Sequence, residues 1–180
     1  MTDGTALREI AAEILTEILE KGQYTHLALF QALSKYQYLE KSDRSFLKRI
    51  VDGTVEYKIQ IDYIINAYSK TKVHKMKPFI RTLLRMSVYQ IYYMDRVPDS
   101  AACNEAVRLA KKRGFSGLSG FVNGVLRSVV RGKGKLTFPD DSVRYSMPDW
   151  ILSLWEENYG AETTHRISSS DERGIMPIST

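Results

Sequence analysis

Positively charged side chains are concentrated in the middle of this chain, at spacings that place several of them on common helix faces. The candidates for contacts to nucleic-acid phosphates are Lys77, Arg81, Arg85, Arg108, Lys111, Lys112, Arg127 and Arg131. Residues four apart lie on the same side of an α-helix, so Lys77, Arg81 and Arg85 are expected to form one stripe. Stripes on neighbouring helices can merge into a field that binds a phosphate backbone and releases its counterions. RNA is the favoured partner of such a surface.

A structural role is the alternative for two of these groups. Lys and Arg near the C-terminal end of a helix stabilise it by complementing the helix dipole. That role would suffice for Lys111 and Lys112, and also for Arg127 and Arg131, which stand in the last turns of expected helices. The case for RNA therefore depends on all the groups occurring together in one segment.

The distribution of charge supports that reading. The 180 residues (20.6 kDa) have a formal net charge of +5, which alone names no partner. Residues 69–135, however, hold 15 Lys and Arg against 3 Asp and Glu, whereas residues 1–68 have a net charge of −2 and residues 136–180 a net charge of −5. A strongly basic middle between two acidic segments requires either an anionic partner or an acidic docking face within the chain.

Other chemically capable residues are better explained by packing. Cys103 has apolar neighbours and is expected to be a small buried side chain. His26, His74 and His165 lie on separate elements without the spacing of zinc ligands, so no metal site is predicted. The segment 114–120 is rich in glycine but lacks the order of a phosphate-binding loop, and is read as a turn.

Tyrosines and asparagines within the basic segment are also assigned mainly to structure. Tyr89, Tyr92 and Tyr93 could stack on unpaired bases, but burial in the core is the favoured interpretation. Asn104 and Asn123 are poor helix formers in mid-helix positions, and each is expected to hydrogen-bond a buried backbone group or its counterpart and so fix the helix register.

The elements that position these residues are helices, because apolar residues recur at i, i+3, i+4 and i+7 and no useful two-residue alternation is present. Helices are expected near residues 7–19, 25–33, 43–65 (one helix, or two with a joint), 78–94, 99–113, 119–131, 140–145 and 149–159. Gly53 marks a bend or a close helix contact, and Pro78 suits a first helical turn. The prediction is an all-α fold: a compact bundle of about seven or eight helices over residues 5–135, followed by a short helical extension over residues 136–180.

The cysteine count and the start of the chain bear on location. A single cysteine excludes a disulfide framework and favours a reducing compartment. The sequence has neither an apolar run of membrane-spanning length nor an export signal at its start, so a cytoplasmic protein with no membrane contact is expected.

Several motifs together resemble the NusB-like RNA-binding domain over about residues 5–131. They are Asp43-Arg44, Gly53-Thr54, Tyr89-Gln90, Asp95 to Pro98, Asn104 to Lys112 and Gly120 to Arg127. This domain occurs as the free transcription antitermination factor NusB and as the N-terminal module of Sun/RsmB-type bacterial 16S rRNA (cytosine-C5) methyltransferases.

Three features resemble the methyltransferase module more than the free factor. They are the segment Tyr24 to Leu29, the tail from Tyr145 to Trp150 with Trp155, and an N-terminal start in which Arg8 alone represents the arginine-rich start of the free factor. The resemblance implies a module that recognises ribosomal RNA, without catalytic residues of its own. The methyltransferase domain, with its S-adenosylmethionine site and two catalytic cysteines, would lie outside these 180 residues.

The resemblance also implies several protein partners, namely the module's own catalytic domain, a ribosomal protein or a second copy in a homodimer. The alternatives to the main reading are a NusB-type antitermination factor and a protein-interaction module. In the second alternative, the basic middle of the chain docks on the acidic residues 136–180 or on a partner protein.

Overall fold

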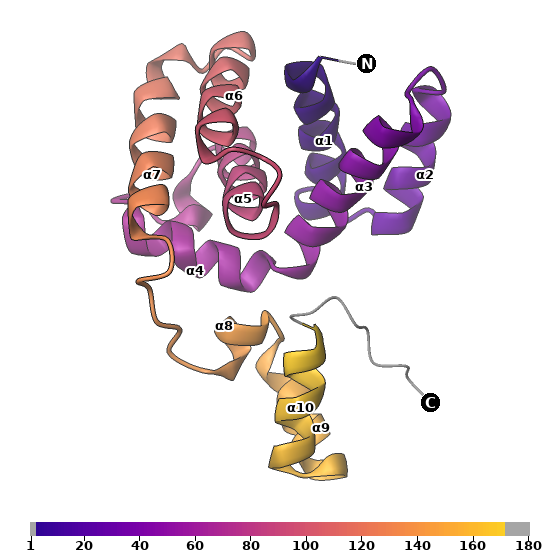
Figure 1. The fold of residues 1–180 in the computed structure, drawn as a ribbon, viewed down its shortest axis with the longest axis vertical. Coiled ribbons are helices and arrows are strands. Elements are labelled where there is room, and N and C mark those ends of the chain that lie inside the picture. Colours follow the sequence, from indigo (N-terminus) through magenta and orange to yellow (C-terminus); the bar gives the residue numbers. More distant parts are fainter. Residues whose placement is uncertain (1–2, 172–180) are drawn as a thin grey trace.

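The all-α prediction is confirmed by the computed structural model, which describes residues 3–171 and contains no strand among them (Figure 1). Seven helices span the region expected to form the bundle, and three more follow it. The helices are α1 (Gly4–Leu19), α2 (Thr25–Lys35), α3 (Lys41–Glu56), α4 (Lys58–Tyr68), α5 (Pro78–Tyr93), α6 (Asp99–Lys112), α7 (Ser119–Gly132), α8 (Asp141–Tyr145), α9 (Asp149–Tyr159) and α10 (Ala161–Asp171), with short 3₁₀ turns η1 (Val73–Lys75) and η2 (Ser116–Leu118).

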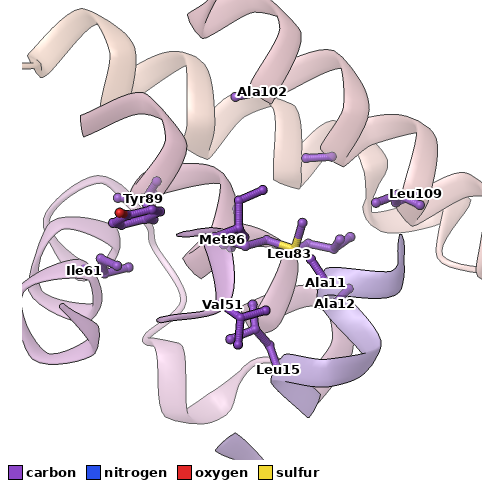
Figure 2. Packing of buried hydrophobic residues seen from close by; sticks show 14 of the residues in the cluster. Ala11, Ala12, Leu15, Val51, Ile61, Leu83, Met86, Tyr89, Ala102 and Leu109 are labelled. Carbon is purple, nitrogen blue, oxygen red and sulfur yellow. The ribbon is translucent and has the colours of Figure 1, made fainter. Parts of the chain in front are cut away.

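Helix α5 is the centre of the bundle and packs against α1, α3, α4, α6 and α7 (Figure 1). It begins at Pro78, as expected, and eleven of its sixteen residues are buried. Figure 2 shows Leu83 and Met86 of α5 beside Ala11 of α1 and Val51 of α3. A helix that is apolar on most sides can be stable only inside the protein, so the other helices surround it.

Gly53 makes a close helix contact, which was one of the two roles expected for it. A Cβ atom at this position would stand 1.9 Å from Cζ of Tyr89, so a side chain larger than hydrogen would displace the buried ring. The joint in the expected 43–65 segment falls at Tyr57, between α3 and α4. The two-helix alternative is therefore the correct one.

The break at Tyr57 leaves the first N–H groups of α4 without partners in their own helix, and Ser146 supplies one. Its hydroxyl accepts hydrogen bonds from the backbone N–H groups of Ile59 (3.1 Å) and Gln60 (3.3 Å). Ser146 is buried and has a left-handed backbone conformation (φ 53°). The Gln60 side chain also donates to the carbonyl of Arg144 at 2.7 Å. These bonds attach α8 to α4 at a fixed position.

Ser146→Ala is expected to lower the free energy of unfolding by about 1–2 kcal/mol, because two buried N–H groups lose their acceptor. Denaturant unfolding followed by circular dichroism measures the change. Ser45→Ala is the matched control, since the Ser45 hydroxyl is exposed and bonds only within its own helix, to the Lys41 carbonyl. Equal midpoints for the two variants would show that Ser146 is not a helix cap.

The extension contains α8 and α9 as predicted, and also α10, which was missed. Residues 161–171 are mostly polar, so they lack the apolar periodicity that identifies a helix. The boundary between a bundle (5–135) and an extension (136–180) stays a prediction, and its last nine residues lie outside the described part. None of the described helices is long and apolar enough to cross a membrane.

Candidate nucleic-acid interface

Helices α6 and α7 form a hairpin at one side of the bundle (Figure 1). The outer face of this hairpin carries several positively charged side chains. Gly114 ends α6 with φ 85°, a left-handed conformation that favours glycine. At 3.6 residues per turn, Asn104, Arg108 and Lys111 lie within about 60° of one another around α6. All three are exposed, whereas Cys103 and Ala106 on the opposite side are buried.

The outer face of α7 carries Arg127 and Arg131, and Arg127 connects the two helices. Its guanidinium donates to the side-chain oxygen of Asn104 on α6 at 2.9 Å and to that of Asn123 on α7 at 3.3 Å. Both asparagines are exposed. The expectation that they hydrogen-bond a buried backbone group is therefore wrong. They are coupled through an arginine, which they hold at the surface.

Six polar and positively charged residues of the two helices make up what we call the α6–α7 basic face: Asn104, Arg108, Lys111, Asn123, Arg127 and Arg131. Arg108 is 67% exposed and pairs with Glu105 at 3.0 Å, while Arg131 bonds the Ser128 hydroxyl at 3.1 Å. Within residues 3–171, no ion pair involves Lys111, Arg127 or Arg131. On α7 the surface is low in the two turns before Arg127, because Gly120 and Gly124 have no side chain and a Cβ at either position would have no atom within 4 Å.

Arg81 and Arg85 lie elsewhere, in an ion-pair network between α1, α4 and α5. Arg85 Nε is 2.7 Å from Asp62, and its side chain is 7% exposed. Arg81 makes a two-point contact with Glu20, which raises the pKa of Arg81 and lowers the pKa of the Glu20 carboxyl through the hydrogen bonds between them. The predicted stripe with Lys77 is therefore not a free surface, and these two arginines are placed where they stabilise the bundle.

Lys112 is also paired with α1, whose acidic residues contact the C-terminal end of α6. Its ammonium contacts Glu9 at 2.5 Å, and Arg113 contacts Glu9 at 2.9 Å and Glu13 at 2.5 Å. The hydrogen bond from Lys112 lowers the pKa of Glu9. An acidic docking face within the chain, one of the two explanations of the charge asymmetry, thus exists and is formed by α1. It leaves Lys111, Arg127 and Arg131 of the α6–α7 basic face without an acidic partner among the described residues.

Lys77 is exposed and precedes α5 at the same end of the bundle as the α6–α7 connection. The rings of Phe79 and Phe115 stack there, with centroids 5.7 Å apart. Lys77 is therefore a candidate for extending the basic face, while Lys112 is a weaker one because Glu9 already pairs with it.

The tyrosines of α5 pack inside the bundle, in agreement with the favoured interpretation. Tyr89 is 6% exposed, and Tyr93 stacks on Tyr57 with ring centroids 4.4 Å apart. Tyr92 is half-buried, and burial raises its pKa. None of these three rings belongs to the α6–α7 basic face, so base stacking is not assigned to them.

Two further residues that the sequence singled out, Cys103 and Arg8, are buried. Cys103 is fully buried, as predicted, and burial raises the pKa of its thiol. Arg8 is buried too: its Nε donates to Gln90 at 2.7 Å and its guanidinium lies 5.2 Å from the centroid of Phe46. The described residues contain no group of three or more His, Cys, Asp or Glu side chains placed to hold a metal ion.

The sequence of the bundle defines the class of the protein. Residues 5–131 match the model of the NusB family, so the chain belongs to that family. It is 38% identical over 169 residues to a probable ribosomal RNA small subunit methyltransferase B of Bacillus subtilis, covering 91% of this chain and 37% of that protein. It is 35% identical over 144 residues to the transcription antitermination protein NusB of Symbiobacterium thermophilum, covering 76% of this chain and 94% of that protein.

A solved structure with the same fold is a crystal structure of antitermination factors NusB and NusE in complex with dsRNA. Its matching chain has a TM-score of 0.66 and 21% identity, over 71% of this chain and 96% of that one. The chain therefore spans nearly the whole length of a free factor, but little more than a third of the Bacillus subtilis methyltransferase.

Proposed function

We propose that this chain is the RNA-recognition module of an S-adenosylmethionine-dependent rRNA (cytosine-C5) methyltransferase and that it binds ribosomal RNA through the α6–α7 basic face. The observation that carries the proposal is the division of the basic segment into two parts. Arg81, Arg85 and Lys112 are paired with carboxylates of the bundle, whereas the exposed Lys111 and Arg131 and the half-buried Arg127 have no acidic partner among the described residues.

The relatives support this assignment at two levels. A NusB structure of the same fold contains dsRNA, and the Bacillus subtilis relative is described as an rRNA methyltransferase. The reading as a methyltransferase module is favoured because that match covers 91% of this chain, against 76% for the free factor. Such a protein would act in the cytoplasm, where RNA is modified.

The geometry suits contacts to phosphates and not the reading of bases. Exposed guanidinium and ammonium groups bind phosphate oxygens whatever the sequence, and such contacts position a protein on RNA. Arg127 is held by Asn104 and Asn123, so it loses little conformational freedom on binding. The low surface at Gly120 and Gly124 leaves room for a sugar-phosphate backbone beside Arg127.

Catalysis is assigned to a domain outside the described helices. S-adenosylmethionine would bind there and supply the methyl group, and no residue of α1–α10 is assigned to the cofactor. The lone thiol of the sequence, Cys103, is buried against the α7 side of the bundle and serves packing. The contribution of this chain is to bind the RNA and to hold it near the catalytic domain.

A salt titration of RNA binding tests the proposal. Each phosphate contact changes the logarithm of the affinity by roughly 0.7–0.9 per log unit of salt, so the four cations of the α6–α7 basic face predict a slope of about −3 to −4. Fluorescence anisotropy with a labelled fragment of 16S rRNA at 50–300 mM KCl measures it. Affinity that does not change with salt, or no binding at all, would reject the proposal.

The interaction-module alternative is less well supported by the packing. Its simplest form places the acidic extension on the basic middle of the chain, but α8 packs on α4, and α9 and α10 pack on α8 and on each other. The described part of the extension therefore leaves the α6–α7 basic face open. A ribosomal protein and a second copy stay predicted partners.

A further inference from the structure

Helix α9 carries an apolar face that the described structure leaves open to solvent. Trp150 is 68% exposed and Leu154 is 47% exposed, one helical turn apart, and Ile151 and Trp155 continue the same face with partial burial. We call these four residues the α9 apolar face. Large apolar side chains gathered on one helix face are unusual on a protein surface without a partner and mark interaction sites.

The extension has too small a core to bury this face itself. Among the described elements, helix α9 packs chiefly on α8 and α10, and its one buried residue is Leu152, which is 8% exposed. The acidic residues Asp149 and Glu156 lie away from Trp150 and Leu154 around the helix, while Glu157, one turn after Leu154, borders the apolar face at its C-terminal end. The face is therefore a separate surface and not the edge of the bundle core.

The face also has a fixed position relative to the bundle. Ser146 caps α4 three residues before α9 begins, and Tyr145 is buried and bonds His165 of α10 at 2.8 Å. The Ser146 bonds therefore fix α8 to α4 of the bundle, and the Tyr145–His165 bond fixes α10 to α8 within the extension. A surface held in this way can set the orientation of whatever binds to it.

The lengths over which this chain matches its relatives indicate what that partner is. The match to the Bacillus subtilis methyltransferase leaves out 9% of this chain at most, so it includes α9, and more than half of that protein lies beyond the match. The family model, by contrast, ends at residue 131, and the match to the free factor already uses 94% of that factor. The extension is therefore matched in the methyltransferase relative, whereas the family model ends before it.

From these observations we infer that the α9 apolar face docks on the methyltransferase domain of the parent protein and sets its orientation relative to the α6–α7 basic face. The identity of the partner rests on the proposed function. Burying a Trp and a Leu side chain stabilises an interface because their apolar surface is removed from water. Aromatic residues are also common anchors of such interfaces. The partner surface is accordingly expected to be apolar.

Hydrogen exchange in a hybrid enzyme tests the inference. In the hybrid, this 180-residue chain replaces the matching N-terminal part of the Bacillus subtilis protein. Backbone amides of residues 149–159 are expected to exchange at least tenfold more slowly in the hybrid than in the free chain. Amides of residues 25–35 should not change, although Phe30 in that helix is 70% exposed.

Two double variants separate docking from folding. Trp150→Gln/Leu154→Gln should restore fast exchange of α9 in the hybrid, whereas Tyr24→Gln/Phe30→Gln, which removes comparable exposed apolar groups from the region of α2, should not. Circular dichroism of the free chain checks that each variant is folded. Because all four side chains are exposed, neither pair is expected to unfold it.

Two results would overturn the inference. One is equal exchange of residues 149–159 in the hybrid and in the free chain. The other is a dimer of the free chain that the Trp150/Leu154 variant abolishes, which would make a second copy the occupant of the face. RNA binding by the free chain is measured separately, so protected α9 without RNA binding would reject the proposed function alone, and RNA binding without protection would reject only the docking.

Discussion

Removing the four positive charges of the α6–α7 basic face together is expected to weaken RNA binding by roughly 100- to 1000-fold at 0.1 M salt. The variant replaces with glutamine the cations of that face, Arg108, Lys111, Arg127 and Arg131. Each lost phosphate contact should also reduce the salt dependence, so the slope of log affinity against log salt should fall toward zero by about 3. The fold should be retained, because none of the four makes an ion pair with another helix in the described structure.

The matched control removes four charges from other helices and loops. It replaces with glutamine the exposed residues Lys21, Lys35, Lys41 and Lys48. Both variants have the same net charge, so a difference between them reports the position of the charges and not their sum. Anisotropy titrations with the same rRNA fragment compare them. Equal losses in the two variants would mean that RNA binding is a non-specific effect of net charge.

Arg85→Gln is expected to lower the free energy of unfolding by about 2–3 kcal/mol, while RNA affinity of the folded protein stays within twofold. Removing one partner of a buried ion pair leaves the other charge without compensation, which costs about 3–5 kcal/mol for full burial. The effect should be smaller here because Asp62 is 21% exposed and also lies 3.3 Å from Lys58. Urea unfolding and an RNA titration on the same preparation measure the two quantities.

A double variant checks the cause of that destabilisation. Arg85→Leu/Asp62→Leu removes both charges and should be more stable than Arg85→Gln, because no uncompensated buried charge remains. A double variant that is much less stable than the single one would show that the hydrogen-bonded pair itself stabilises the bundle. A tenfold or greater loss of RNA affinity in folded Arg85→Gln would mean that Arg85 belongs to the RNA-binding surface.

The helices could be predicted from the sequence because apolar spacing and helix-ending glycines are local signals. Gly114 and Gly160 both have positive φ and follow α6 and α9 where the sequence indicated an end. Contacts between distant segments have no such signal. The cap that Ser146 places on α4 spans 87 residues, and α10 has a helix pattern too polar to recognise.

The sequence predicts which segment is rich in basic residues, but not which of these residues form a free surface. The sequence shows that residues 69–135 are basic, yet it does not show that Glu9 and Glu13 of α1, and Glu20 just after it, lie against part of that segment. Equal spacing of Lys77, Arg81 and Arg85 predicts a shared helix face, but burial of that face depends on tertiary packing. Asn104 precedes Arg108 by four residues and Lys111 by seven, so its position on the same helix face could have been recognised from the sequence.

Crosslinking of the chain to ribosomal RNA, followed by identification of the linked peptides, tests the central claim most directly. We predict that crosslinked residues fall within 104–131, on α6 and α7, with Lys77 as the one expected site outside them. Few or no crosslinks are expected on α2 and α3. Crosslinks concentrated in residues 25–56, with residues 104–131 unmodified, would contradict the assignment of the α6–α7 basic face as the RNA-binding surface.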